Sequence, residues 1–367
     1  MATQKSSNRH KVFALGELFS GPGGIGTGAL RASATDESGK VFRLEHAWAN
    51  DYDPSSCESY RANLPIDDEM VLCEPVQQFV ERFPELPPIQ ALTFGFPCND
   101  FSAVGETQGL DGKFGPLYEF GAQAIDFFRP DWFFAENVGG LTHANEGRAF
   151  ATILDRLVDA GGGYEIVPHL YRLEDYGIPQ RRHRVIIVGI RSDIGLKFRA
   201  PAPTHDQDTW VTAKEAFEMG EDVSSLPNNE PTRQHPTVVE RLRLIRPGEN
   251  AWSADLPPHL QLNVKGARLS NIYRRLDPDR PAYTVTGSGG GGTHMYHYAE
   301  PRALTNRERA RLQSFPDDFV FLGRKEAVRK QIGMAVPPLG AEIVITAILK
   351  TFAGVPYESV DPTWDLA

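Results

Sequence analysis

Two side chains in this sequence, a cysteine and a glutamate, have the types and positions needed for covalent catalysis. Cys98 follows the apolar run Ala91–Phe96, and Pro97 fixes the backbone just before the thiol. Glu136 follows the apolar run Trp132–Ala135, where a solvated surface acid is hard to explain. A thiol beside a carboxyl group suits nucleophilic attack with acid assistance. A lone cysteine after a strand is more often a core residue, so the hypothesis depends on its pairing with Glu136.

A glycine-rich turn precedes both of these residues. The segment Gly21–Gly26 matches a GxGxxG pattern between an expected strand and an expected helix. Glycines there let a ligand approach the backbone, and the helix N-terminus offers free N–H groups. Asp51 and Glu74 end the next two expected strands and suit ribose hydroxyls and an adenine amino group, while Tyr52 can stack on a base. The pattern predicts an adenosine-containing cofactor, either a dinucleotide or S-adenosylmethionine, with a turn that binds no ligand as the alternative.

The elements that position these residues are short apolar runs alternating with helical patterns. We expect strands at Val12–Phe19, Glu45–Asn50, Val71–Cys73, Ala91–Phe96, Trp132–Ala135, Glu165–Arg172 and Arg184–Arg191. Helical patterns run from the glycine turn to about Ala32 and over Arg148–Ala160. The alternation predicts an α/β fold with a Rossmann-like parallel sheet and helices on both faces.

The character of the chain changes after about Arg191. Residues 193–300 are rich in Pro, Gly, Asn, Asp and Thr and include the low-complexity run Gly287–Gly292. This composition predicts a second, smaller domain that is irregular or β-mixed. Helical periodicity returns at Thr305–Phe315 and from about Ala327 to Phe352.

Composition excludes several classes of protein. The 367 residues are 41% hydrophobic and 23% charged, which excludes a disordered or collagen-like chain. No run of 18 apolar residues and no apolar N-terminal segment occur, so we expect no membrane association and a cytoplasmic location. The three cysteines form no CxxC pair, so we expect neither a disulfide framework nor a metal site.

The net charge of −10 hides two basic stretches. Residues 172–199 contain seven Lys or Arg against three acids, and residues 302–330 contain eight against four. Only the face that meets a phosphate backbone must be basic, so nucleic-acid binding is compatible with the acidic total. On charge alone, an acidic cytosolic protein is the alternative.

Six motifs occur in the order seen in DNA (cytosine-5) methyltransferases. They are FSGPGG (19–24), GFPC (95–98), ENV (136–138), QRRHR (180–184), RALTNRE leading into ARLQSFP (302–316) and QIGMAVPP (331–338). The chain therefore resembles the prokaryotic, S-adenosylmethionine-dependent members of that family over residues 15–340, nearly its whole length.

The resemblance implies a role for each catalytic candidate. Cys98 would attack C6 of a cytosine flipped out of the helix, after which C5 takes the methyl group from S-adenosylmethionine. Glu136 would bind N3 and the exocyclic amine and supply acid assistance. Arg182 and Arg184 would stand near the flipped nucleotide, with Arg184 at cytosine O2. A basic strand edge that contacts only the DNA backbone is the alternative for both arginines.

The resemblance also implies a cofactor site. Its residues are Phe19, Gly21, Pro22, Gly23, Gly24, Ile25, Asp51, Tyr52, Glu74, Pro97, Leu117, Ala335 and Val336. Asp51 would bind the ribose and Tyr52 would stack on adenine. Two positions depart from the family pattern: Asn99 stands where most members have Gln, and Met334 where most have Asn. Met cannot donate the hydrogen bonds of Asn, so the pocket differs there in detail and the reaction class does not.

By the same resemblance, residues 193–300 form the target-recognition domain and residues 301–328 a hinge or connecting helix. Residues 1–192 together with 329–367 form the catalytic domain. DNA contacts are expected from Ser102, Arg268, Asn271, Arg274, Arg275, Thr286 and Gly289. Arg can pair with guanine and Asn with adenine in the major groove. The run Gly287–Gly292 either lets the backbone approach DNA or forms a flexible hairpin tip.

The favoured interpretation is an enzyme that makes 5-methylcytosine within a specific sequence of double-stranded DNA. It would act as a solitary enzyme or beside a cognate restriction endonuclease, and as a monomer, because one recognition region can read a site asymmetrically. A tRNA cytosine methyltransferase and a catalytically inactive DNA-binding relative are the alternatives. A nicotinamide dehydrogenase would explain the glycine turn but none of the later motifs.

Overall fold

The computed structural model describes residues 9–96, 117–263 and 269–365. The chain divides into two compact units. Unit 1 comprises Met1–Arg172, His183–Pro203 and Val336–Ala367, and unit 2 comprises Leu173–Arg182 and Thr204–Ala335. Unit 2 thus includes the segment 301–328 that was expected to connect two domains, as well as most of 193–300.

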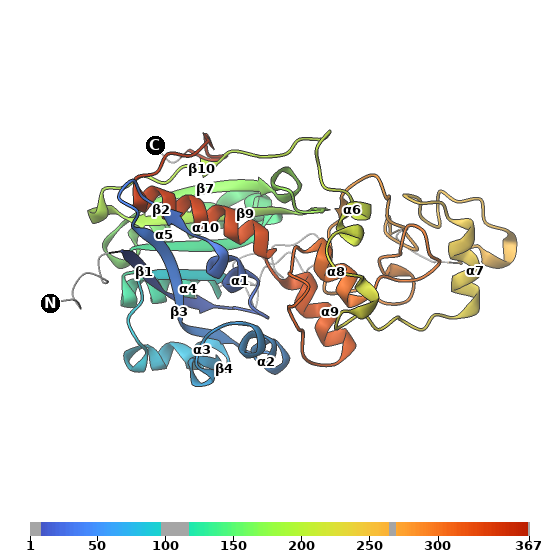
Figure 1. The fold of residues 1–367 in the computed structure, drawn as a ribbon, viewed down its shortest axis with the longest axis horizontal. Coiled ribbons are helices and arrows are strands. Elements are labelled where there is room, and N and C mark those ends of the chain that lie inside the picture. The colour runs from blue at the N-terminus through green and yellow to red at the C-terminus, as the bar shows by residue number, and fades with distance from the viewer. Residues whose placement is uncertain (1–8, 97–116, 264–268, 366–367) are drawn as a thin grey trace. The chain divides into compact units, whose positions relative to one another are not determined.

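Unit 1 is built on a twisted α/β sheet (Figure 1). Its strands are β1 (His10–Leu18), β2 (Ala34–Thr35), β3 (Val41–Asp51), β4 (Val71–Cys73), β5 (Ala91–Gly95), β6 (Trp132–Val138), β7 (Tyr164–Arg172) and β9 (His183–Arg191). Its helices are α1 (Gly24–Arg31), α2 (Pro54–Asn63), α3 (Val76–Phe79), α4 (Tyr118–Phe128), α5 (Arg148–Asp159) and α10 (Pro338–Ala353). A separate small pairing joins β10 (Ala200–Pro201) to β12 (Ser359–Val360).

The strand order is β2-β3-β1-β5-β6-β9-β7, with β4 paired to the outside of β3. Strands β4, β3, β1, β5 and β6 run parallel, as the alternation of strands and helices predicts. Strand β9 runs antiparallel to both β6 and β7, so the sheet is mixed rather than wholly parallel. No helix of unit 1 separates β7 from β9, and strands joined without a crossover helix pair antiparallel.

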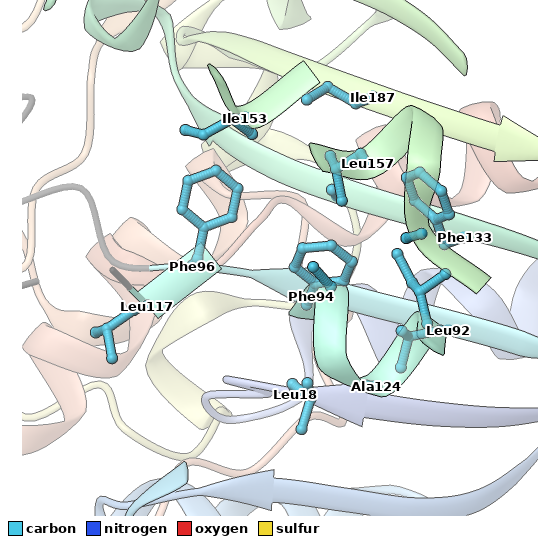
Figure 2. Packing of buried hydrophobic residues seen from close by; sticks show 14 of the residues in the cluster. Leu18, Leu92, Phe94, Phe96, Leu117, Ala124, Phe133, Ile153, Leu157 and Ile187 are labelled. Atoms are coloured by element: carbon cyan, nitrogen blue, oxygen red, sulfur yellow. The ribbon is translucent and has the colours of Figure 1, made fainter. Parts of the chain in front are cut away.

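Both faces of the sheet are covered, because neighbouring residues of a strand point to opposite sides. On one side Phe13 packs edge-on against Trp132 and against Phe352 of α10. On the other side Phe133, the residue after Trp132, contacts Phe94. Figure 2 shows this second core, in which helices α4 and α5 contribute Ala124, Ile153 and Leu157 beside Leu92 and Ile187.

Unit 2 has little regular structure, as its composition predicts. Its elements are β8 (Gln180–Arg181), α6 (Ala213–Glu218), α7 (Pro236–Leu244), β11 (Ala282–Tyr283), α8 (Asn306–Leu312) and α9 (Lys325–Met334). Helix α8 begins at a capping box, in which Thr305 and Glu308 satisfy each other's backbone N–H groups. Strands β8 and β11 pair in parallel and anchor the basic segment 180–182 inside this unit.

The helical pattern expected from Ala327 to Phe352 is two helices, α9 and α10. Ala335 leaves the helical conformation and Pro337 caps α10, because consecutive prolines at 337 and 338 disfavour helix in the residues before them. The stretch 325–353 is long and apolar enough to cross a membrane by length and composition alone. Inside the protein 72% of its most apolar window is buried, as is typical of a core helix.

Candidate active site and DNA-binding residues

The predicted catalytic segments of unit 1 meet at the carboxyl ends of neighbouring strands. Strand β5 pairs with β6 so that Gly95 lies opposite Glu136. A Cβ atom at Gly95 would lie 3.3 Å from Oε2 of Glu136, so this carboxyl group is directly beside the end of β5. Cys98 follows Gly95 by three positions, and Pro97, Cys98 and Ser102 lie outside the described residues.

Glu136 and Arg184 form an ion pair across β6 and β9. Arg184 Nε lies 2.7 Å from Glu136 Oε1, and each side chain is only 12% exposed. Arg184 also donates to the carbonyl of His183. A charged pair with so little water around it interacts more strongly than a surface pair. The structure therefore brings together two of the four predicted catalytic residues and fixes their relative orientation.

Asn137, the residue after Glu136, holds the end of strand β5. Its side-chain Nδ2 donates to the carbonyl of Phe96 at 3.1 Å, and its Oδ1 accepts the N–H of Val138 at 2.8 Å. The first bond joins the end of β6 to the residue that follows β5, and the second is local to β6. Asn137 thus positions the chain at the point where it leaves β5 toward the predicted nucleophile.

The glycine-rich turn has the backbone conformations that its sequence predicts. Gly21 and Gly23 have positive φ angles of 56° and 100°, and Phe19 also has a positive φ of 54°. A bulky residue rarely adopts this conformation, and such outliers cluster at ligand sites. Nothing lies within 4 Å of a Cβ atom at Gly21, so the turn has open space beside it.

Asp51, at the end of β3, ties the turn to the neighbouring strand. Its Oδ2 accepts the N–H of Gly21 and its Oδ1 accepts the N–H of Asp53, both at 2.9 Å. A carboxylate has about four acceptor positions, so capacity remains for ribose hydroxyls. Tyr52 is 60% exposed, although its ring is apolar. Glu74 is fixed by a backbone hydrogen bond to Asp51 and lies 3.5 Å from Arg82.

These observations fit an adenosine-containing cofactor. The open space beside Gly21, the exposed ring of Tyr52 and the carboxyl groups of Asp51 and Glu74 lie at one edge of the sheet. Ser20 Oγ is buried and has no hydrogen-bond partner among the described residues, which leaves a polar atom for a ligand. Of the remaining predicted cofactor residues, Leu117 packs into the core beside α4, as Figure 2 shows.

A buried polar cluster behind this turn escaped the sequence analysis. Glu17 of β1 is fully buried and accepts hydrogen bonds from the Tyr60 hydroxyl at 3.1 Å and from the backbone of Gly26. Burial raises the pKa of Glu17 to about 8 and lowers that of His46, which contacts the same hydroxyl, to about 4. An acid in the middle of the apolar run Val12–Phe19 was the available signal.

Arg182 lies in unit 2, where it is 2% exposed. Its guanidinium donates to the backbone carbonyls of Val285, Gly333 and Ala335 at 2.9–3.2 Å. Arg182 thus links separate segments of unit 2 through hydrogen bonds. Its contact with the flipped nucleotide remains a prediction. Ala335 belongs to unit 2 and Val336 to unit 1; both are buried, while Met334 is 58% exposed.

The predicted DNA-reading arginines differ from one another. Arg275 is 6% exposed, and its guanidinium donates to backbone carbonyls that include those of Leu242, Ile245 and His297. A base contact would compete with these bonds, so the structure favours a scaffold role for Arg275. Arg274 stacks over the ring of Tyr283 at 4.8 Å and lines a cavity of about 370 Å³. Arg268 lies outside the described residues.

The glycine run packs against helix α9. A Cβ atom at Gly333 would lie 2.0 Å from the backbone nitrogen of Gly287, so both glycines are needed for this approach. Gly289 has a φ of 124°, and Thr286 donates to the carbonyl of Ser288. Asn271 accepts the backbone N–H of Arg274 through its carbonyl. DNA contacts by Thr286, Gly289 and Asn271 stay predictions.

The chain matches the model of the C-5 cytosine-specific DNA methylase family over residues 13–350. It is 56% identical over 362 residues to type II methyltransferase M.BbvI of Brevibacillus brevis, with 96% of this chain and 95% of the relative covered. It is 39% identical to type II methyltransferase M.NgoFVII of Neisseria gonorrhoeae, with 97% and 90% covered.

Solved structures share the fold. A DNA modification methyltransferase encoded within an E. coli prophage superimposes with a TM-score of 0.66 at 23% identity, covering 92% of this chain and 99% of that one. The Dnmt2 methyltransferase of S. pombe has a TM-score of 0.58 at 14% identity, covering 92% and 98%. The family match extends over nearly the whole chain, and this protein belongs to the C-5 cytosine-specific DNA methylases.

Proposed function

We propose that this enzyme methylates C5 of a cytosine flipped out of double-stranded DNA, through a covalent bond between Cys98 and C6. S-adenosylmethionine is the methyl donor that the family implies, and it supplies an electrophilic methyl group on a sulfonium. The observation that carries the proposal is the Glu136–Arg184 pair beside the end of β5, three positions before Cys98.

The proposed role of the Cys98 thiolate is to make cytosine C5 nucleophilic enough to accept a methyl group. Cytosine C5 is too weak a nucleophile by itself, and addition of the Cys98 thiolate to C6 places an electron pair on C5. C5 would then bond to the methyl carbon of the bound donor as the sulfonium S–CH3 bond breaks, with its electron pair left on sulfur as the thioether product. Transfer of the C5 proton to solvent water then re-forms the C5–C6 double bond and expels the thiolate, so Cys98 is regenerated.

Glu136 and Arg184 suit the Watson–Crick edge of the base. The carboxyl group of Glu136 accepts from the exocyclic amine and, when protonated, donates to N3. This donation offsets the negative charge that the ring gains as sulfur adds. When the base is bound, Arg184 gives up part of its contact with Glu136 and donates a hydrogen bond to cytosine O2. The low exposure of both side chains strengthens these contacts.

The residues around the glycine turn are assigned to the methyl donor. Phe19, Gly21, Pro22, Gly23, Gly24 and Ile25 form the backbone cradle, and Asp51, Tyr52 and Glu74 receive the adenosine. Pro97, Leu117, Ala335 and Val336 are assigned to the same donor on the family resemblance alone. Support comes from the open space at Gly21, the unpaired Ser20 hydroxyl among the described residues and the exposed Tyr52 ring.

The partner of the enzyme is double-stranded DNA with one specific target sequence. The relatives named above are type II methyltransferases, which supports a role beside a cognate restriction endonuclease in a bacterial cytoplasm. We propose a monomer, because a single recognition region reads an asymmetric site without a second copy.

The test is methyl transfer by the purified protein. Labelled S-adenosylmethionine is supplied with mixed-sequence duplex DNA or with total tRNA in separate reactions. We expect label at cytosine C5 of the DNA and none in the tRNA. Label in tRNA alone would refute the DNA substrate.

Two cysteine variants separate the chemistry from the fold. Cys98→Ser is expected to abolish methyl transfer, and Cys73→Ser provides the matched control, because Cys73 is exposed at the end of β4. DNA carrying 5-fluorocytosine should trap the wild-type protein covalently, since fluorine at C5 cannot leave as a proton does. Undiminished activity of Cys98→Ser would contradict the proposed nucleophile.

A further inference from the structure

One buried arginine of unit 2 differs from all the others in the described part of that unit. Arg182, Arg241, Arg275, Arg307 and Arg311 are also buried, and each donates to at least one backbone carbonyl. Arg309 of α8 is 2% exposed, and its backbone is hydrogen-bonded to Thr305 and Gln313. Its guanidinium has no hydrogen-bond or ion-pair partner among the residues that the structure describes. A guanidinium with five donors and no acceptor is costly to bury.

The surroundings of Arg309 add positive charge. Arg329 of α9 is near enough to lower its pKa, and the Nε of Arg329 is itself buried without an acceptor in the described residues. Burial together with the charges of Arg309, Arg329 and Lys325 lowers the pKa of His294 to about 4, so this imidazole is neutral. Burial lowers the pKa of Arg309 only to about 10, which leaves it positive at neutral pH.

The nearby groups that carry or can carry negative charge do not neutralise Arg309. Glu308 is already bound by Arg302, with the two pairs of atoms at 2.7 and 2.8 Å, and it also accepts the N–H of Thr305. Burial raises the pKa of Tyr283 to about 12, so its phenol is neutral. Glu230 and Glu326 lie near Lys325, and Glu326 also lies near His294, but neither is paired with Arg309. The donors of the Arg309 guanidinium are therefore left without an acceptor among the described residues.

This charge adjoins the glycine run. Tyr296, whose ring lies in the field of Arg309, donates its hydroxyl to the carbonyl of Gly291 at 2.8 Å. Gly287 packs on α9 at Lys330, one residue after Arg329. No atom lies within 4 Å of a Cβ position at Gly290 or Gly291, so the surface beside the cluster has little steric bulk to hinder a ligand.

We propose that Arg309, with Arg329 and Lys325 beside it, forms a binding site for one phosphate of the DNA backbone. The proposal rests on the double-stranded DNA substrate of the proposed function. A phosphate provides the acceptors that Arg309 lacks, and its binding at this place fixes the position of the glycine run relative to the duplex.

Salt dependence of DNA binding provides the first test. Each phosphate contact adds about 0.9 to the slope of log affinity against log salt concentration. For a mixed-sequence duplex, Arg309→Met should reduce this slope by about 0.9, whereas Arg309→Lys should retain most of it. Arg243→Gln removes one exposed positive charge from α7 and is the matched control. An unchanged slope in Arg309→Met, or an equal loss in the control, would overturn the proposal.

Thermal unfolding without DNA provides the second test. Removal of a buried, unpaired cation should raise the unfolding midpoint of Arg309→Met above that of the wild type, while its DNA affinity falls. A lower midpoint would mean that Arg309 supports the fold, and it would overturn the proposal. A third measurement adds inorganic phosphate to the wild type during thermal unfolding. If phosphate raises the unfolding midpoint but the salt slopes of DNA binding are equal in wild type and Arg309→Met, the site binds a free anion and the DNA-phosphate proposal is overturned. Failure in either test leaves methyl transfer by the wild type intact, so it is distinct from failure of the proposed function.

Discussion

Substitution of Glu17 by glutamine should remove a large pH dependence of stability. Glu17 is fully buried beneath the cofactor turn, and its pKa rises from 4.5 to about 8 on folding because burial disfavours the carboxylate. Between these values the unfolded chain has released the proton and the folded chain still holds it. The wild type therefore loses stability as pH rises from 4.5 to 8.

The size of the effect follows from the two pKa values. At about 1.4 kcal/mol for each pKa unit, the rise corresponds to about 5 kcal/mol over the whole range. His46 titrates in the opposite sense at lower pH, because its pKa falls from 6.5 to about 4 and stability is lost below 6.5. Between pH 6.5 and 8 Glu17 makes the larger contribution of the two and by itself lowers stability by about 1.5 kcal/mol.

Urea unfolding of wild type and Glu17→Gln across this pH range measures the difference directly. The glutamine side chain still accepts from Tyr60 and Gly26 and cannot ionise, so its advantage over the wild type should grow by about 1.5 kcal/mol between pH 6.5 and 8. Stability curves that stay parallel would show that Glu17 is already ionised in the folded protein, and the argument from burial would fail.

Three further substitutions test separate parts of the account. Glu136→Gln should lower the rate of methyl transfer by roughly 10²–10⁴-fold in single-turnover assays with little change in binding of S-adenosylmethionine, and a near-wild-type rate would contradict its role. Gly28→Ala places a Cβ atom 2.3 Å from the carbonyl oxygen of Pro338 and 2.7 Å from the nitrogen of Glu342. It should cost about 1–3 kcal/mol in urea unfolding, and a stable variant would mean that α1 and α10 separate easily. Tyr52→Ala should leave stability within about 0.5 kcal/mol, because the ring is exposed, and weaken binding of S-adenosylmethionine by about tenfold in calorimetry. Unchanged affinity would remove Tyr52 from the site.

Where the chain alternates strand and helix, local sequence patterns correctly predicted the α/β fold and the residues at the carboxyl ends of its strands. The apolar runs that end before Asp51 and Glu136 became strands, and the glycine turn became the left-handed turn before α1. These features depend on short-range sequence. The antiparallel direction of β9 was not predicted, because strand direction depends on which neighbours pair and not on the strand's own residues.

The roles of individual arginines depend on tertiary contacts that a motif does not contain. Arg182 and Arg184 are two positions apart, yet one donates to backbone carbonyls in unit 2 and the other pairs with Glu136 in unit 1. The roles of Arg275 and Arg309 could not be predicted from the sequence either. The backbone carbonyls that Arg275 binds come from distant segments, and the lack of acceptors around the Arg309 guanidinium leaves no signal in the neighbouring residues. Glu17 is different, because an acid inside an apolar run was visible in the sequence.

The most direct test of the central claim is bisulfite sequencing of DNA from a methylation-free bacterial host that expresses the protein. The account predicts protected cytosines within one short sequence motif, and their complete absence in a host that expresses Cys98→Ser at the same level. Soluble wild-type protein with no protected cytosine, or equal protection in the Cys98→Ser host, would contradict it.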